Sequence, residues 1–217
     1  MKKIVIIVFA LAVSLYMAFC ENTNDFSVNS VPKFGDSPYV VINKNIAEFD
    51  ESELTTKSYE EYKGLDYLGR CRSVKACVSK EMMPEDERCD ISYIKPSGWH
   101  SIKADDVEDG WLYNRCHLYM RAIGGDDSKT NMITGTRYLN VEGMLPFETE
   151  VFDYVSKTDN HVMYCVEPVY ENFNLICSGV HMMAYSVEDE GKGINFNVYC
   201  YNVQPNHEIN YLTGNER

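Results

Sequence analysis

The sequence predicts a mixed α+β fold with a central, largely antiparallel sheet and flanking helices. One amphipathic helical pattern begins at Pro146, and three strand-like runs follow it, separated by short polar turns. Strands joined by short turns pair antiparallel, because a parallel pair needs a long crossover. No internal repeat or second domain is visible, so residues 38–217 are expected to form one domain.

The first 20 residues have the composition of an export signal. Two lysines precede an apolar run over residues 4–15, and a small-x-small cleavage site ends at Cys20. A lipidated Cys20 is the alternative, against which the bulky Phe19 argues. The apolar run is too short to span a bilayer comfortably. We therefore expect a secreted protein without stable membrane association, whose residues 21–37 form a flexible polar leader.

The chain is strongly acidic. Its formal net charge is −13, and removal of the two signal lysines makes it −15. Non-specific affinity for nucleic acid comes mainly from Lys and Arg, so this charge argues against a protein that coats DNA. A metal and a few arginines can still create a local positive site on an acidic protein. Any binding to nucleic acid is expected to be weak and sensitive to salt.

Eight cysteines occur in the chain, at positions 20, 71, 77, 89, 116, 165, 177 and 200. In an exported protein the seven that follow the signal predict up to three disulfides and one leftover thiol. The first candidate pairs are Cys77 with Cys89 and Cys165 with Cys177, each 12 residues apart. The alternative is that several are buried free thiols. No CxxC or HxxxH spacing is present, so a zinc site is not expected.

The elements before the helix are short. Residues 39–42 form a β-type run, and Ser58 to Glu61 fits a capping box that predicts a short helix ending near Gly64. Residues 91–113 combine strand-like pieces with turns, which places His117 at the end of a strand or in the loop after it. Residues 124–128 are a loop by composition.

The long helix is predicted from Pro146 to Lys157. Proline is favoured at the first helical position, Glu148 lies in the first turn, and Lys157 closes the last turn. The three strands after it are expected at residues 162–170, 175–187 and 194–203.

The segment from residue 114 to residue 148 contains groups suited to phosphodiester hydrolysis. A neutral His can take a proton from water near pH 7. An Asn carbonyl is a hard oxygen donor for Mg²⁺, and an Arg can hold a phosphate through two hydrogen bonds. Hydrolysis with these groups needs no nucleophilic side chain. The candidates are Arg115, His117, Asn131, Arg137, Asn140 and Glu148.

Two motifs resemble a known family. Asn114-Arg115-Cys116-His117 resembles the Asp-Arg-Gly-His box of the DNA/RNA non-specific endonucleases, the ββα-metal nucleases. Residues 130–148, which include Thr-Gly-Thr-Arg-Tyr-Leu-Asn, are similar to the segment after that box in secreted streptococcal-type DNases. The resemblance covers most of residues 39–213 and implies a ββα-metal core within the α+β fold.

The resemblance implies a role for each candidate. His117 matches the general base, Asn140 the ligand of a single divalent metal, and Glu148 the helix acid that orients water around the metal. The other implied roles are a catalytic position near the phosphate for Arg115, support of substrate or histidine by Asn131, and substrate contacts by Arg137 and Asn114. The implied cofactor is Mg²⁺, with Mn²⁺ as the alternative. The implied substrate is DNA, with RNA as an alternative, cut to leave a 5′-phosphate; no inhibitor protein is identified.

Two positions depart from the family box. Asn114 stands where much of the family has Asp, and Cys116 replaces Gly, which is difficult if the backbone there needs a positive φ. A disulfide from Cys116 to Cys71 is one explanation of the second change. Together with the acidic charge, these departures leave an alternative function, a catalytically inactive exported binding protein on the same fold.

Overall fold

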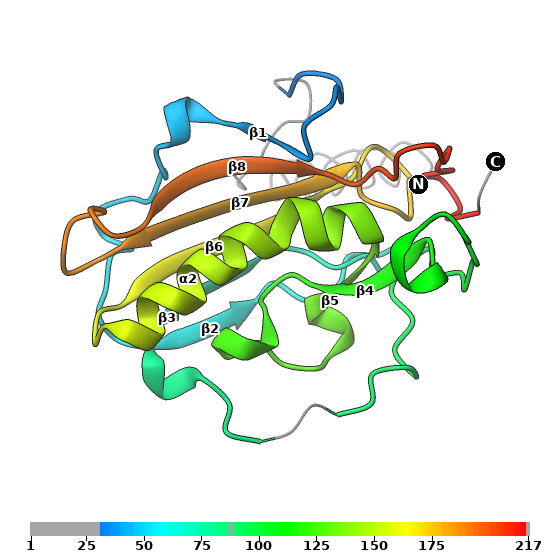
Figure 1. Ribbon diagram of the computed structural model, residues 1–217. Coiled ribbons are helices and arrows are strands. Elements are labelled where there is room, and N and C mark those ends of the chain that lie inside the picture. The colour runs from blue at the N-terminus through cyan, green and yellow to red at the C-terminus, as the bar shows by residue number, and fades with distance from the viewer. Residues whose placement is uncertain (1–30, 87–88, 216–217) are drawn as a thin grey trace, which may run out of the picture.

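A computed structural model describes residues 31–86 and 89–215 and contains a six-stranded sheet (Figure 1). All neighbouring strands in this sheet are antiparallel. A smaller antiparallel pair of strands lies beside it. The predicted α+β class is confirmed. The sheet order is β1 (Tyr39–Val41), β8 (Asn195–Tyr201), β7 (Gly179–Ser186), β6 (Val162–Val169), β3 (Val74–Val78), β2 (Tyr59–Tyr62), and the pair is β4 (Tyr113–His117) with β5 (Met132–Thr136).

The main core lies between the large sheet, helix α2 and the β4–β5 pair. Side chains on a strand alternate between its two faces. One face of β6, β7 and β8 therefore presents a continuous apolar surface, to which Tyr164, Met182 and Val198 belong. Helix α2 crosses this face in Figure 1 and buries Val151 and Val155 against it. The periodic patterns that predict the helix and these three strands are confirmed, with strand ends that differ by a few residues.

Helix α2 (Leu145–Lys157) begins with Pro146 in its first turn, as predicted. A π-helical segment, Leu139–Met144, leads directly into it. Such segments are rare and occur frequently at functional sites. The π-helical segment was not predicted from the sequence, and it carries Asn140 at its second position.

The predicted helix after Ser58 is wrong, because Tyr59–Tyr62 is strand β2 at the edge of the large sheet. The Ser58 hydroxyl caps no helix; it is 2.8 Å from the Ser79 hydroxyl and donates to Glu81 at 2.6 Å. An isolated helix this short is unstable, whereas pairing with β3 satisfies the backbone of the segment.

The predicted disulfides are also wrong, since all seven cysteines among the described residues are free. Cys77 is buried in β3 whereas Cys89 is exposed. Cys165 alternates with the core-facing residues of β6, so it points away from the core that contains Cys177. The suggested bridge from Cys71 to Cys116 is absent as well, and the Cys71 thiol donates to the Thr130 carbonyl at 2.6 Å.

The export signal and the first part of the predicted leader, residues 21–30, lie outside the described residues. Within residues 31–86 and 89–215, no helix has the length and apolar character needed to cross a bilayer.

Asn202, immediately after β8, joins the small strand pair to the large sheet. Its side chain is fully buried. The side-chain N–H groups donate to the carbonyls of Thr134 at 3.1 Å and Cys177 at 3.0 Å. Its side-chain oxygen accepts the backbone N–H of Thr136 at 2.9 Å. One amide therefore satisfies two backbone groups of β5 and fixes where that strand lies.

We expect Asn202→Ala to lower the free energy of unfolding by about 2–5 kcal/mol, because each buried polar group left without a partner costs roughly 1–3 kcal/mol. Urea unfolding followed by tryptophan fluorescence measures the change. The control is Asn215→Ala, which removes an exposed amide. Equal stabilities of the two variants would show that the Asn202 amide does not hold the sheets together.

Candidate active site

A cavity of about 220 Å³ lies where β4, the following loop, the π-helical segment and α2 meet. Four of the predicted site residues line it: Arg115, His117, Asn140 and Glu148. They come from strand β4, from the π-helical segment and from helix α2. The remaining lining residues are Cys89, Ile91, Met120, Arg121, Ala122, Asp127 and Leu145.

The alternation of strand β4 decides which residues of the Asn-Arg-Cys-His box reach the cavity. Arg115 and His117 lie on one face of the strand and line the cavity. Cys116 lies on the opposite face and is fully buried, so it cannot act with its neighbour His117 as a nucleophile–base pair. The backbone of Cys116 is extended, and its sulfur lies over Gly135, where a Cβ would be only 2.3 Å away.

His117 ends strand β4 with a hydrogen bond to a carboxylate. Its Nε2 lies 2.8 Å from Oδ1 of Asp127, and both side chains are largely buried. The second oxygen of Asp127 lies 3.5 Å from the Arg121 guanidinium, which also contacts Asp86 at 2.9 Å. The histidine is therefore held by a carboxylate that is itself held by an arginine.

Arg115 uses part of its guanidinium to hold a neighbouring loop. Its Nε donates to the Ile94 carbonyl and its Nη2 to the Ser92 carbonyl, both at 2.6 Å. The guanidinium also stacks on the Trp99 ring, with its carbon 4.0 Å from the ring centre. These contacts fix one wall of the cavity and leave fewer N–H groups for a phosphate.

Asn131 lies outside the cavity and organises the loop behind His117. Its side chain is fully buried. The oxygen accepts the backbone N–H of Tyr119 at 2.8 Å, and the N–H groups donate to the carbonyls of Tyr119 at 2.9 Å and Asp126 at 2.8 Å. All of these contacts are to the loop that carries Asp127, so Asn131 can support the histidine only through that loop.

Asn114 and Arg137 do not line the cavity. The side-chain oxygen of Asn114 is buried with no hydrogen-bond partner. Arg137 forms ion pairs with Glu108 at 3.2 Å and Asp109 at 2.9 Å. The structure therefore brings neither side chain to the group formed by His117, Asn140 and Glu148.

Glu148 is a buried carboxyl group in the wall of the cavity. Only 7% of the residue is exposed, and burial raises the pKa of its carboxyl to about 8. No described positive group offsets this effect. Asn140 contributes an amide to the same cavity. One amide and one carboxylate are oxygen donors that suit a hard divalent cation, which keeps several water ligands of its own.

The described residues contain no cluster of three or more His, Cys, Asp or Glu that could hold a metal. An ion at Asn140 and Glu148 would therefore have few protein ligands. Mg²⁺ tolerates this arrangement, because it loses its water reluctantly and is usually bound by one or two carboxylates. The donor set thus fits the cation that the family resemblance implies.

Two cavity residues, Arg121 and Asp127, were missed in the sequence analysis. Asp127 lies in a loop identified only by its Gly-Gly-Asp-Asp-Ser composition, and it follows His117 by ten residues. No residue spacing indicates that this loop folds back on the strand end. The two adjacent glycines are the sequence signal that could have indicated a close approach. In the structure, a Cβ at Gly125 would lie 1.8 Å from the Tyr119 carbonyl oxygen.

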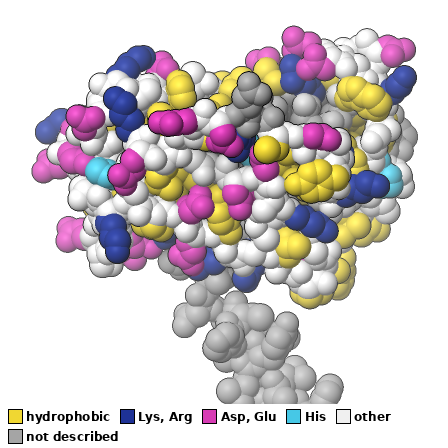
Figure 2. Space-filling model, turned by 90° about the horizontal axis from the view of Figure 1, so that it is seen from below, with side chains coloured by type: hydrophobic (Ala, Val, Ile, Leu, Met, Phe, Trp, Pro, Cys, Tyr) yellow, Lys and Arg dark blue, Asp and Glu magenta, His cyan; other side chains and the backbone are white. Residues whose placement is uncertain are grey.

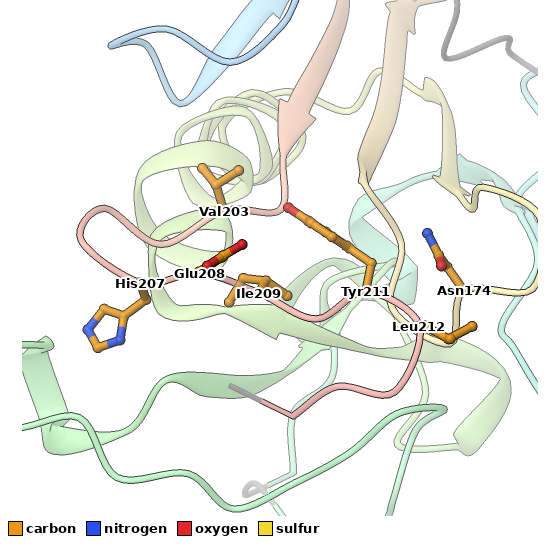
Figure 3. Close-up of a pocket in the computed structure, with 7 residues that line it drawn as sticks. All are labelled: Asn174, Val203, His207, Glu208, Ile209, Tyr211 and Leu212. Atoms are coloured by element: carbon orange, nitrogen blue, oxygen red, sulfur yellow. The ribbon is translucent and has the colours of Figure 1, made fainter. Parts of the chain in front are cut away.

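A larger cavity, of about 440 Å³, is lined mainly by residues near the C-terminus (Figure 3). Its lining includes His207 and Glu208, but the His207 ring points away from Ile209 and Leu212 in this view. The Nε2 atom of His207 lies 3.0 Å from Asp106. This cavity does not gather a base and metal donors, so we assign the chemistry to the smaller one.

The face of the molecule shown in Figure 2 is not a basic platform. Figure 2 shows acidic side chains spread among basic ones over one face of the molecule. The formal charge of −13 points the same way. Attraction of an anion must therefore depend on the charges within the cavity, namely its arginines and any cation bound there.

The comparisons with known proteins point to one family. A sequence profile described as DNA/RNA non-specific endonuclease matches residues 51–188. A "Deoxyribonuclease" of Streptococcus dysgalactiae subsp. equisimilis is 32% identical over 108 residues, which are 48% of this chain. The matched region spans about a third of that relative, 32% of its length.

Solved nuclease structures share the fold. The Sda1 nuclease with a bound zinc ion has a TM-score of 0.72 at 24% identity, over 88% of this chain and 99% of that one. NucA from Streptococcus agalactiae without metal has a TM-score of 0.75 at 23% identity, over 88% and 92%. Its magnesium-bound form has a TM-score of 0.72 at 24% identity, over 84% and 90%.

The buried carboxyl of Glu148 should make the metal-free protein less stable at alkaline pH. Its pKa of about 8 in the folded state exceeds the ordinary value of 4.5, so the folded state holds this proton more tightly. The stabilisation of the folded state by this tighter proton binding is complete below pH 4.5 and is lost as the pH rises toward 8. Glu148→Gln cannot titrate, so its stability relative to the wild type should rise by a few kcal/mol over this range, at roughly 1.4 kcal/mol per pKa unit.

Urea unfolding in EDTA at pH 5 and pH 8.5 measures this difference. The control is Asp153→Asn on the same helix, where the carboxylate is exposed and pairs with Lys157. A Glu148→Gln effect that stays constant with pH would contradict the raised pKa.

Proposed function

Because the family profile spans more than half of it, the chain belongs to the DNA/RNA non-specific endonucleases, and we propose that it is a metal-dependent hydrolase of DNA. The observation that carries the proposal is the placement of His117, Asn140 and Glu148 around one cavity. A base and two oxygen donors on adjoining elements are the groups that phosphodiester hydrolysis by one metal requires. RNA is a second substrate of the same chemistry.

In this proposal each cavity residue has one role. His117 accepts a proton from water, whose oxygen then bonds to phosphorus. The bond between phosphorus and the 3′-oxygen breaks, the leaving oxygen takes a proton from solvent, and the product carries a 5′-phosphate. Asn140 would hold the divalent cation, and Glu148 would hold water beside it. When bound, the cation supplies positive charge that stabilises the charge developing on the phosphate.

Two arginines line the cavity and would face the substrate phosphate. Arg115 holds a wall of the cavity through two backbone carbonyls, so its support of the reaction is mainly structural. Arg121 lies beside Asp127 and adds positive charge. Neither Asn114 nor Arg137 is needed for the proposed chemistry, because neither lines the cavity.

The alternative function, an inactive binding protein, is less well supported, because the change to Asn114 does not alter the cavity. The change to Asn114 would matter most if the side chain at this position entered the cavity. The alternation of β4 directs it to the other face of the strand. The acidic charge remains, and it favours weak, salt-dependent substrate binding rather than the absence of catalysis.

We further propose that the protein is exported, with residues 1–20 as its signal and residues 38–217 as a single nuclease domain. The charge pattern of the first 20 residues supports the first part. The two sheets share one main core, which supports a single domain over residues 38–217. The preferred metal is Mg²⁺, with Mn²⁺ as the alternative, because both accept hard oxygen ligands.

A plasmid-nicking assay tests the proposed function. The purified protein should relax and then degrade supercoiled DNA with Mg²⁺ and not with EDTA. We expect His117→Ala to lower the rate by about 10²–10⁴-fold, the usual contribution of a positioned base. Asn140→Ala should raise the Mg²⁺ concentration needed for half-maximal activity.

The control is His100→Ala, because His100 is exposed, lies outside the cavity and contacts a carbonyl of Thr213. Folded wild-type protein that leaves DNA and RNA intact with both Mg²⁺ and Mn²⁺ would contradict the proposed function.

A further inference from the structure

We propose that Asp127 is the positioning residue of this site, which fixes the ring of His117 and leaves Nδ1 as the nitrogen that accepts the proton. The inference rests on the proposed function for its catalytic consequence. It rests on the geometry of the loop at residues 124–128 for the contact itself.

The contact between Asp127 and His117 is short and sheltered. Oδ1 of Asp127 lies 2.8 Å from Nε2, and the exposed fractions of the side chains are 14% for Asp127 and 19% for His117. A carboxylate can only accept a hydrogen bond, so the ring must carry its proton on Nε2. Nδ1 is then the nitrogen with the free electron pair, and no described residue makes a recorded polar contact with it.

The carboxylate is held in place from its other side. Oδ2 of Asp127 lies 3.5 Å from Nη1 of Arg121, and Nη2 of the same arginine lies 2.9 Å from Asp86. The guanidinium of Arg121 donates toward this second oxygen, so both oxygens of the carboxylate act as acceptors. Two oxygens with two different partners restrict the rotation of the carboxylate, and its hydrogen bond to Nε2 restricts the direction in which the imidazole points.

The loop that carries Asp127 is built to approach the strand end closely. Gly125 has no room for a side chain, because a Cβ would lie 1.8 Å from the Tyr119 carbonyl oxygen. Asn131 ties both Tyr119 and Asp126 through its buried amide. The Asp126 N–H donates to the Tyr62 hydroxyl at 3.1 Å. Contacts on both sides of the turn therefore determine where Asp127 lies.

This arrangement gives Asn131 a function that does not require contact with substrate. Asn131 holds the loop, the loop places Asp127, and Asp127 orients His117. The base must meet its water at hydrogen-bond distance, so a freely rotating imidazole would lose most productive encounters. Groups that orient a metal-binding histidine through its second nitrogen change affinity or activity by about 10- to 100-fold when they are removed, and we expect an effect of the same order for a base.

The kinetic test compares three variants with the wild type on an oligonucleotide duplex with Mg²⁺. Asp127→Ala should lower kcat by about 10- to 100-fold and change KM less than threefold, because the orienting group acts on the base and not on the substrate. Added formate should restore part of the kcat of Asp127→Ala. Asp127→Asn keeps an acceptor oxygen and should fall between Asp127→Ala and the wild type.

The matched control is Asp126→Asn, which removes the same charge from the neighbouring position. The Asp126 carboxylate bonds to Ser128 and makes no recorded contact with His117. Its kcat should remain close to that of the wild type. A kcat for Asp127→Ala equal to that of the control, or a loss confined to KM, would overturn the positioning role.

A second measurement does not depend on activity. An imidazole N–H bonded to a carboxylate gives a downfield proton resonance, which ¹⁵N-histidine labelling identifies and a His117→Gln variant assigns. We expect this resonance in metal-free wild type and in Asp126→Asn, and its loss in Asp127→Ala at unchanged thermal stability. Its absence from the wild type, or its persistence in Asp127→Ala, would overturn the contact.

The two measurements separate the two proposals. If the wild type cuts no nucleic acid but the resonance depends on Asp127, the proposed function fails and the positioning of His117 holds. If the wild type cuts DNA and Asp127→Ala cuts it equally well, the positioning role fails and the proposed function holds.

Discussion

The side chain of Asn202 is the constraint on which the site depends. Its amide bonds two backbone groups of β5 and one carbonyl at Cys177, in the segment before β7. Strand β5 fixes β4, and therefore His117, through the antiparallel register between them. It also leads after two residues into the π-helical segment and α2. Strand β5 thus ties the strand that carries His117 to the large sheet, while helix α2 also packs on that sheet directly through Val151 and Val155.

The alternation of β4 explains why the departures from the family box are compatible with the proposed chemistry. Positions 114 and 116 face away from the cavity, whereas Arg115 and His117 face it. A thiol at position 116 fits because the neighbouring strand has a glycine, Gly135, where its sulfur lies. The amide at position 114 removes a carboxylate from the far side of the strand. A carboxylate still reaches the histidine, but it comes from Asp127 on the following loop.

The sequence predicts those parts of the fold whose signals are local. Helix α2 and strands β6, β7 and β8 follow from periodic apolar residues, and the position of His117 at or just after a strand end follows from the strand-like pieces and turns before it. Strand β2 was predicted as a helix, because a capping box is a local signal and pairing with β3 is not. The free state of the seven described cysteines could not be predicted, since pairing depends on which face of a strand each cysteine occupies. Asp127 was missed for a related reason: its partner lies ten residues away, across a turn that no motif marks.

The charges of the cavity bear on the order in which a cation and a substrate would bind. While Glu148 is protonated, Arg115 and Arg121 exceed the charge of an ionised Asp127 by only one, so the cavity alone offers modest attraction to a phosphate. Burial raises the pKa of the Glu148 carboxyl to about 8, so the group holds a proton at neutral pH. A divalent cation bound there would displace this proton. Such a cation would bring two positive charges and release one proton, so the net charge of the cavity would become more positive by one. In an acidic protein without a basic platform on the face shown in Figure 2, substrate affinity should therefore increase once the cation is in place.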